Sequence, residues 1–248
     1  MDNTIGAGNK LILLIETLKQ HGSLGVSELA AETGIPKSTV HAHLSTLGEH
    51  GYVVQDRSKA YRLSLQFLDI GSKVRETRGI YDEIVPKLDQ VAEETNEKAW
   101  WTVEENGMAV FMAKSAGNRA IQTNARIGLH LELYQLAAGI AILANLPADR
   151  RAEILDGYEY PLPSGHDREE FESKLVSVRD EGVAYDTNSF IEGVTGIGVP
   201  LLDNTGTVHG AISISGPNNR LADEQDANKL TDLLRGISGE LQVNLSYL

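Results

Sequence analysis

Apolar residues in the first quarter of the chain recur at helical spacing, and glycines interrupt them. Within each segment they lie three or four positions apart, a period that predicts amphipathic helices. The predicted helices cover residues 9–20, 28–33 and 36–50. Ser27 is expected to open the short middle helix, and the helices are expected to end at Gly22, Gly34 and Gly51. Two short β-type segments, 52–55 and 60–63, follow around a polar turn.

Two helices around a tight glycine turn, followed by a two-stranded wing, are typical of a winged helix-turn-helix. Such units bind DNA, although winged helices also serve as protein-interaction modules. In helix 36–50 the side chains opposite the apolar stripe of Val40, Leu44 and Leu47 are small or polar, so they can enter a major groove. We therefore predict DNA binding by this helix and the wing. The predicted residues are Lys37, Ser38, Thr39, His41, Ala42, Ser45, Arg57 and Lys59.

The start of helix 36–50 and the wing supply the positive charge of this surface. Free N–H groups at the helix start favour a phosphate, although a Ser-Thr pair there is often only a cap. The two basic wing residues are placed for phosphates or a minor groove. His43 lies beside the apolar stripe and is expected to be partly buried and structural. A metal site shared by His41 and His43 is not expected, because residues i and i+2 of a helix do not share a face.

The rest of the chain places strands in hairpins and helices in separate blocks. The predicted strands are 98–105, 108–115, 183–187, 193–202 and 207–215. Asn106-Gly107 between the first two strands is a strong hairpin signal. Further helices are predicted over 65–78, 80–95, 133–145, 168–180 and 223–247. The first of these is a connector with Leu65, Leu68 and Val74 on its apolar side.

This arrangement indicates an α+β fold with an antiparallel sheet in the C-terminal part. We expect a DNA-binding domain at residues 1–64, a linker helix at 65–79 and a second domain at 80–248. The charge is divided accordingly. The chain of 248 residues has a net charge of −13, yet residues 1–80 hold nine basic and eight acidic residues against 13 and 27 in residues 81–248. A near-neutral head on an acidic body suggests domains with different partners.

A solvated surface is the simplest interpretation of the acidic body, and a halophilic origin would explain it together with the ten lysines of the chain. The longest apolar run near the N-terminus, 11–15, is too short for a signal peptide or a membrane span. We therefore expect a soluble, cytoplasmic protein that does not associate with membranes.

Several classes of catalyst are excluded by missing motifs. The chain has no cysteine, which removes thiol nucleophiles, redox CxxC pairs and thiolate metal sites. It has no G-x-S-x-G elbow, no H-E-x-x-H and no P-loop, and residues 193–198 have the wrong glycine spacing for a dinucleotide fingerprint. Asp186 and Glu192 are interpreted as an exposed carboxylate pair. No enzymatic activity, cofactor or metal is expected.

Two stretches resemble the IclR family of transcriptional regulators. The first contains Val26-Ser27-Glu28-Leu29-Ala30, then residues 34–41 (GIPKSTVH), Leu47 and Gly51-Tyr52. The second contains residues 181–183 (EGV), Asp186, 192–194 (EGV), 199–201 (VPL), 210–217 (GAISISGP) and Arg220. Gly128 and residues 137–144, with Gly139 inside, are similar to the central glycine-alanine helix of the family. The likeness covers nearly the whole chain in the family's order.

The resemblance implies a winged helix-turn-helix, a linker helix and a GAF-like effector domain, acting as a dimer or tetramer on near-palindromic operator DNA. It implies a repressor or activator of metabolic, catabolic genes whose effector is an organic, sugar or aromatic acid. The implied effector-binding residues are Ala120, Thr123, Ala137, Ala138, Asp186, Gly196, Ser213 and Ser215. The alternative is a DNA-binding regulator whose C-terminal domain only oligomerises.

The residues themselves support part of this. Ser213 and Ser215 lie two apart on a predicted strand, so both hydroxyls face one side and need partners if buried. A ligand oxygen or a backbone carbonyl would serve equally. The glycines of 193–198 leave room for close approach, either by a ligand or by a packed helix.

The chain departs from the usual family sequence at three places. Ala42-His43 replaces an arginine and a leucine, which indicates a different operator. Residues 132–136 read Glu-Leu-Tyr-Gln-Leu where Pro-Leu-His-Ala-Thr is common, and Ile140 replaces a lysine. The effector of other family members therefore cannot be transferred to this chain.

Overall fold

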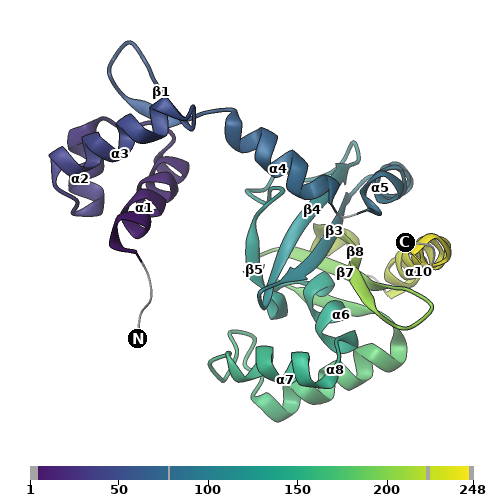
Figure 1. Ribbon diagram of the computed structural model, residues 1–248. Coiled ribbons are helices and arrows are strands. Elements are labelled where there is room, and N and C mark those ends of the chain that lie inside the picture. Colours follow the sequence, from purple (N-terminus) through teal and green to yellow (C-terminus); the bar gives the residue numbers. More distant parts are fainter. Residues whose placement is uncertain (1–4, 78, 222–223, 246–248) are drawn as a thin grey trace. The chain divides into compact units, whose positions relative to one another are not determined.

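A computed structural model describes residues 5–77, 79–221 and 224–245 (Figure 1). The chain divides into two compact units, Met1–Thr77 and Arg78–Leu248. Each unit has its own apolar core. Among the described helices, none combines the length and apolar character needed to cross a lipid bilayer.

The first unit is a winged helix-turn-helix, as predicted. Its elements are α1 (Gly6–His21), α2 (Val26–Thr33), α3 (Lys37–Glu49), β1 (Val53–Gln55), β2 (Tyr61–Leu63) and α4 (Gln66–Glu76). The strands pair in antiparallel fashion, and a bridge between Leu24 and Tyr61 ties the wing to the segment before α2. Fully buried leucines from α1, α2 and α3 meet in the core around Val40. The apolar stripe of α3 therefore faces inward, which fixes the outward face of that helix.

One expectation for this unit was wrong. Ser27 does not open α2, because the helix begins at Val26 and the Glu28 carboxylate accepts a hydrogen bond from Gly25 N at 2.7 Å. The predicted apolar side of the connector helix is exposed within the described part of this unit, since Leu65, Leu68 and Val74 are 77%, 66% and 57% exposed. Periodicity predicts a face that could be buried, but not what covers it. The predicted end of this helix at Arg78 lies outside the described residues.

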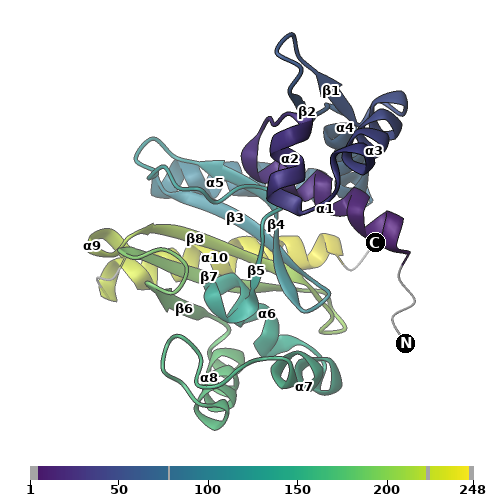
Figure 2. The same cartoon turned by 90° about the vertical axis from the view of Figure 1, so that its left-hand side faces the viewer.

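The second unit is built on a six-stranded antiparallel sheet in the order β5-β4-β3-β8-β7-β6 (Figure 2). Its strands are β3 (Lys98–Glu105), β4 (Met108–Ala116), β5 (His130–Glu132), β6 (Ala184–Thr187), β7 (Val194–Leu202) and β8 (Val208–Pro217). Its helices are α5 (Tyr81–Thr95), η1 (Leu133–Gln135), α6 (Ala137–Asn145), α7 (Ala148–Asp156), α8 (Arg168–Glu181), α9 (Asn218–Leu221) and α10 (Glu224–Leu245). The α+β prediction is confirmed.

Helices cover both faces of this sheet (Figures 1 and 2). α5 and α10 pack on one face, where Trp101, Ile212 and Ile214 lie in the larger core cluster. α6 packs on the other face, with α8 and α7 beyond it, around Ala138 and Ala211. Neighbouring residues of one strand therefore belong to different layers, as the twofold repeat of a strand requires.

Turn chemistry explains several boundaries of the second unit. Asn106 and Gly107 have φ values of 53° and 82°, the left-handed pair that a tight hairpin turn needs. Gly107 N donates to the Glu104 carboxylate at 2.7 Å, which closes the turn. At α8, Asp167 and Glu170 each accept a hydrogen bond from the other's backbone N–H, a capping box.

The helix predicted over 133–145 is two elements. Leu136 is extended, with φ −133° and ψ 139°, and separates the one-turn η1 from α6. The break lets the chain turn so that α6 lies flat on the sheet with every residue from Ala137 to Ala144 buried. α7, α9 and β5 were not predicted. The last predicted helix reaches residue 247, and residues 222–223 and 246–248 lie outside the described part.

Candidate functional site

The outward face of α3 carries the side chains predicted to read DNA. His41, Ala42 and Ser45 are exposed, as are Lys37 and Ser38 at its start, while Thr39 is half-buried. The Ser45 hydroxyl donates to the carbonyl of His41 at 2.9 Å. Its hydrogen is thereby used within the helix, so its oxygen remains as an acceptor. His43 is half-buried beside Leu44, which confirms its predicted position beside the core stripe.

The wing tip is a tight turn organised by one carboxylate. Asp56 Oδ1 accepts hydrogen bonds from Ser58 N at 2.8 Å, Ser58 Oγ at 2.6 Å and Ala60 N at 3.0 Å. These bonds, the Ser58 hydroxyl first, lower the pKa of Asp56. Lys59 has a left-handed backbone with φ 68°, and both Arg57 and Lys59 are exposed. The turn thus holds two cations at the end of the wing on a fixed backbone.

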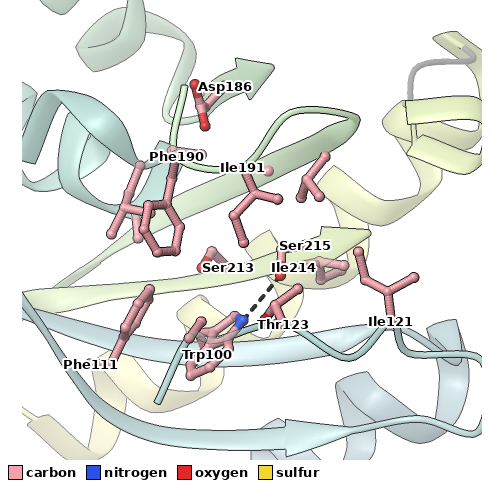
Figure 3. A pocket seen from close by; sticks show the side chains of 16 residues that line it. Trp100, Phe111, Ile121, Thr123, Asp186, Phe190, Ile191, Ser213, Ile214 and Ser215 are labelled. Carbon is pink, nitrogen blue, oxygen red and sulfur yellow. Dashed lines mark hydrogen bonds between the residues drawn. The ribbon is translucent and has the colours of Figure 1, made fainter. Parts of the chain in front are cut away.

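In the second unit the α6-facing side of the sheet encloses a narrow, mostly apolar cavity (Figure 3). Its walls come from β3, β4, β6, β7, β8, the start of α6 and the segments 121–125 and 190–194. The lining residues are Trp100, Phe111, Ile121, Thr123, Ala125, Leu136, Ala137, Ala138, Asp186, Phe190, Ile191, Val194, Gly196, Ser213, Ile214 and Ser215. A concave apolar site with few polar groups is the usual form of a small-molecule pocket.

Aromatic rings form much of the wall. The Trp100 and Phe111 rings lie 4.4 Å apart between centroids, and Phe190 reaches toward them from the loop after β6 (Figure 3). Trp100 Nε1 donates to Ser215 Oγ at 3.0 Å. This bond engages the oxygen of Ser215, so the hydroxyl hydrogen is still available to a ligand oxygen or a backbone carbonyl, the two partners expected from the sequence.

Asp186 is the one acidic side chain among the lining residues. It is half-buried on β6, and Oδ1 accepts a hydrogen bond from the Ser189 hydroxyl. Burial raises the pKa of its carboxyl, against the hydrogen bond from Ser189. The interpretation of Asp186 and Glu192 as an exposed pair was wrong for Asp186, because β6 carries it into the cavity while Glu192 stays exposed in the loop.

The glycines of β7 serve the close packing of α6. A Cβ at Gly198 would lie 2.7 Å from Ala138 N, and one at Gly196 would lie 3.3 Å from Ala137 Cβ. The helix start can lie against the strand only because both positions lack side chains. Of the two readings of these glycines, helix packing is the one observed, and it also brings Ala137 and Ala138 to the cavity wall.

Seven of the eight residues predicted to bind an effector lie around this one cavity. Ala120 does not, because its N–H closes a turn onto Gly117 O at 3.1 Å and the chain reaches the cavity one residue later, at Ile121. The aromatic and aliphatic wall was missed, because in a sequence such residues look like ordinary core. Alternation along β3 was an available signal, since Trp100 and Trp101 must face opposite sides of the sheet.

Comparison with known proteins agrees with this architecture. Residues 9–63 match the IclR helix-turn-helix domain, and residues 72–242 match the bacterial transcriptional regulator IclR C-terminal domain. The chain is 29% identical over 239 residues to the probable HTH-type transcriptional regulator ArcR of Halobacterium salinarum, covering 94% of this chain and 90% of that protein. The crystal structure of Thermotoga maritima IclR has a TM-score of 0.80 at 25% identity and 97% coverage of both chains.

A further solved structure is an IclR homologue of Microbacterium hydrocarbonoxydans complexed with 4-hydroxybenzoate. Its TM-score is 0.79 at 18% identity, covering 98% of this chain and 100% of that one. At this identity the likeness shows the shared fold. The two domain matches occur in order, and the C-terminal one alone spans more than half of the chain. The chain therefore belongs to the IclR family and is a DNA-binding transcription regulator, not an enzyme.

Proposed function

We propose that this regulator controls metabolic genes, specifically genes of catabolism, in response to a small organic acid that binds in the cavity. The head, residues 1–64, would bind near-palindromic operators, the helix within 65–79 would link it to the effector domain, and residues 80–248 would bind the effector. The observation that carries the proposal is the preformed apolar cavity with a few polar groups on one sheet face. That a homologue of the same fold was crystallised with 4-hydroxybenzoate supports the class of ligand.

Self-association is part of the proposal. Exposed apolar side chains on α1 and α4, among them Ile12, Leu68 and Val74, are 59%, 66% and 57% exposed and would be covered in a homodimer or tetramer. A twofold axis between two heads would set the half-site spacing on the operator. Effector binding would then change the relative positions of the two heads. The coupling free energy would equal the difference in the effector's binding free energy between the two states, commonly 1–3 kcal/mol.

Replacing His41 by alanine is expected to weaken specific operator binding about tenfold while non-specific binding changes little, because a base contact is lost and phosphate contacts remain. His41 is exposed on the outward face of α3. Competition mobility shifts with operator and unrelated DNA measure both affinities. His50→Ala, at the far end of the same helix, is the matched control. Equal losses on both DNAs would remove His41 from base readout.

Replacing Asp186 by alanine is expected to shift the effector concentration needed for half-maximal response at least fivefold and to leave operator affinity intact. The carboxyl lies in the cavity wall of the second unit, whereas α3 lies in the first. The control is Glu192→Ala, which removes an exposed carboxylate from the loop after β6. An unchanged response in the Asp186 variant would show that this carboxyl does not contact the effector.

The experiment that tests the whole proposal is a mobility shift on DNA from the upstream region of the protein's own gene, with salt titrated. Organic, sugar and aromatic acids are then added singly. Saturable, sequence-specific binding that one compound abolishes or strengthens supports both operator binding by the head and the response to an effector. Specific binding that no compound changes favours a C-terminal domain that only oligomerises. No specific binding at any salt concentration would favour a head that binds proteins.

A further inference from the structure

A buried lysine stands directly behind the cavity wall. Lys98 begins β3 and shares a sheet face with Trp100, two residues on, which lines the cavity. It is 5% exposed, and its Nζ donates to Thr123 Oγ1 at 3.0 Å. In the described part of the chain no carboxylate lies within ion-pair distance of this ammonium.

An ammonium buried in this way is costly unless an anion compensates it. Transfer of a charge out of water is unfavourable, and one neutral acceptor satisfies only one of three N–H donors. Burial, and then the nearby Lys114, lower the pKa of Lys98. Both effects would be relieved by a negative group on the cavity side of Thr123.

Two hydroxyls beside Lys98 have their hydrogen-bonding direction set by their neighbours. Thr123 Oγ1 accepts from Lys98 Nζ, and Ser215 Oγ accepts from Trp100 Nε1. Each hydroxyl keeps its own hydrogen, and both line the cavity. This end of the cavity therefore offers O–H donors with a positive charge behind them, which suits a carboxylate.

The other end of the cavity carries the acidic side chain of Asp186, and the sheet register fixes the position of Asp186 relative to Lys98. Asp186 pairs with Gly196, Gly196 with Ser215, and Ser215 with Lys98, so these residues form one row across β6, β7, β8 and β3. With strands about 4.8 Å apart, the row spans roughly 14 Å between the end Cα atoms. Figure 3 shows Asp186 well apart from Thr123 and Ser215. Asp186, whose carboxyl pKa is raised by burial, is an acceptor or shared-proton partner for a ligand donor.

We propose that Lys98, acting through Thr123, selects effectors with a carboxylate at the β3 end of the cavity, and that Asp186 receives a hydrogen-bond donor at the β6 end. The aromatic walls between them suit a flat apolar body. The ligand class is thus a flat organic acid that carries a hydroxyl or amino group opposite its carboxylate. This inference rests on the proposed effector function of the same cavity.

The test compares acids with their neutral amides on the full-length protein. Titration calorimetry is performed with 4-hydroxybenzoate and 4-hydroxybenzamide, benzoate and benzamide, and lactate and lactamide. For an acid that binds, the affinity of the wild type is expected to be at least tenfold higher than its affinity for the corresponding amide. Lys98→Met should lose at least tenfold affinity for the acid and little for the amide, since it removes the positive charge behind the Thr123 hydroxyl, which strengthens that hydroxyl as a donor to a carboxylate. Thr123→Val should show a smaller loss in the same direction.

Lys114→Met is the matched control, because Lys114 is an exposed lysine whose Nζ lies 5.8 Å from the Trp100 ring centroid on the same sheet face. It should preserve the preference for acids, and melting curves establish that each variant is folded. The inference is overturned if Lys98→Met and Thr123→Val keep the wild-type preference, or if the wild type favours no acid over its amide. If operator binding still responds to a neutral compound, the proposed effector function stands without the preference for acids. If operator binding responds to no compound, the proposed effector function and this inference are both wrong.

Discussion

Replacing Gly139 by alanine is expected to lower the free energy of unfolding of the C-terminal unit by about 3 kcal/mol or more, because overpacking against backbone cannot relax locally. A Cβ at this position would lie 2.1 Å from Leu133 O and 2.7 Å from Leu133 C and Cα. Leu133 is itself fully buried in the one-turn helix η1. The clash can be removed only by moving η1 and α6 apart.

Urea unfolding followed by tryptophan fluorescence measures this effect in the right unit, because the two tryptophans of the chain, Trp100 and Trp101, both lie on β3. The matched control is Gly236→Ala in α10, where a Cβ would meet no atom within 4 Å. There the change is expected to raise stability by up to about 1 kcal/mol, since alanine favours a helix interior over glycine. A Gly139 variant as stable as the wild type would show that η1 can move away from α6 at little cost in free energy.

The same contact also determines the shape of the cavity. α6 lies close enough to the sheet for Ala137 and Ala138 to line the cavity because Gly139 fits against η1 and Gly198 against the helix start. The glycine-alanine character of this segment is thus a packing requirement that also shapes the cavity wall. A variant that lifts α6 would be expected to open the cavity as well as to destabilise the unit.

Much of the fold could be predicted from the sequence where local chemistry decides it. The amphipathic period of α1, α3 and α8 and the Asn106-Gly107 turn each specify one local structure, and all appear as expected. Where the outcome depends on neighbours, prediction failed. The break at Leu136 follows from fitting α6 onto the sheet, which the period of residues 133–145 does not contain.

The candidate site shows the same division. The serines of β8 and Asp186 could be named in advance, because their family motifs are short and specific. The row that joins Asp186 to Lys98 could not, since it depends on the register of three strand pairs far apart in the sequence. Lys98 looked like any charged residue at the start of a strand. Its burial against Thr123, 25 residues further along, became visible only in the folded chain.

The second large effect is expected at the ion pair between Glu97 and Arg220, where Glu97 directly precedes Lys98 in the chain. Glu97 is 4% exposed, and its carboxylate accepts two hydrogen bonds from Arg220, at 2.5 Å from Nε and 2.8 Å from Nη2. Gly216 makes room for it, because a Cβ there would lie 2.6 Å from Glu97 Oε2. Arg220→Met would leave a buried carboxylate without its partner. The free energy of unfolding should fall by about 3 kcal/mol, as for other broken buried pairs.

Arg220 also reaches the loop that carries Thr123, since its Nη2 donates to Arg119 O at 3.0 Å. Loss of this anchor should weaken effector binding at least fivefold while operator affinity stays unchanged, because the head is a separate compact unit. Glu97→Gln combined with Arg220→Met should recover part of the stability, as a neutral amide costs less to bury than a carboxylate, but not the effector binding. Arg168→Met, which removes a surface guanidinium paired with Asp156 and Glu172, should change neither property measurably. If the double variant recovered effector binding as fully as stability, the pair would act through stability alone and the bond to Arg119 would have no separate role.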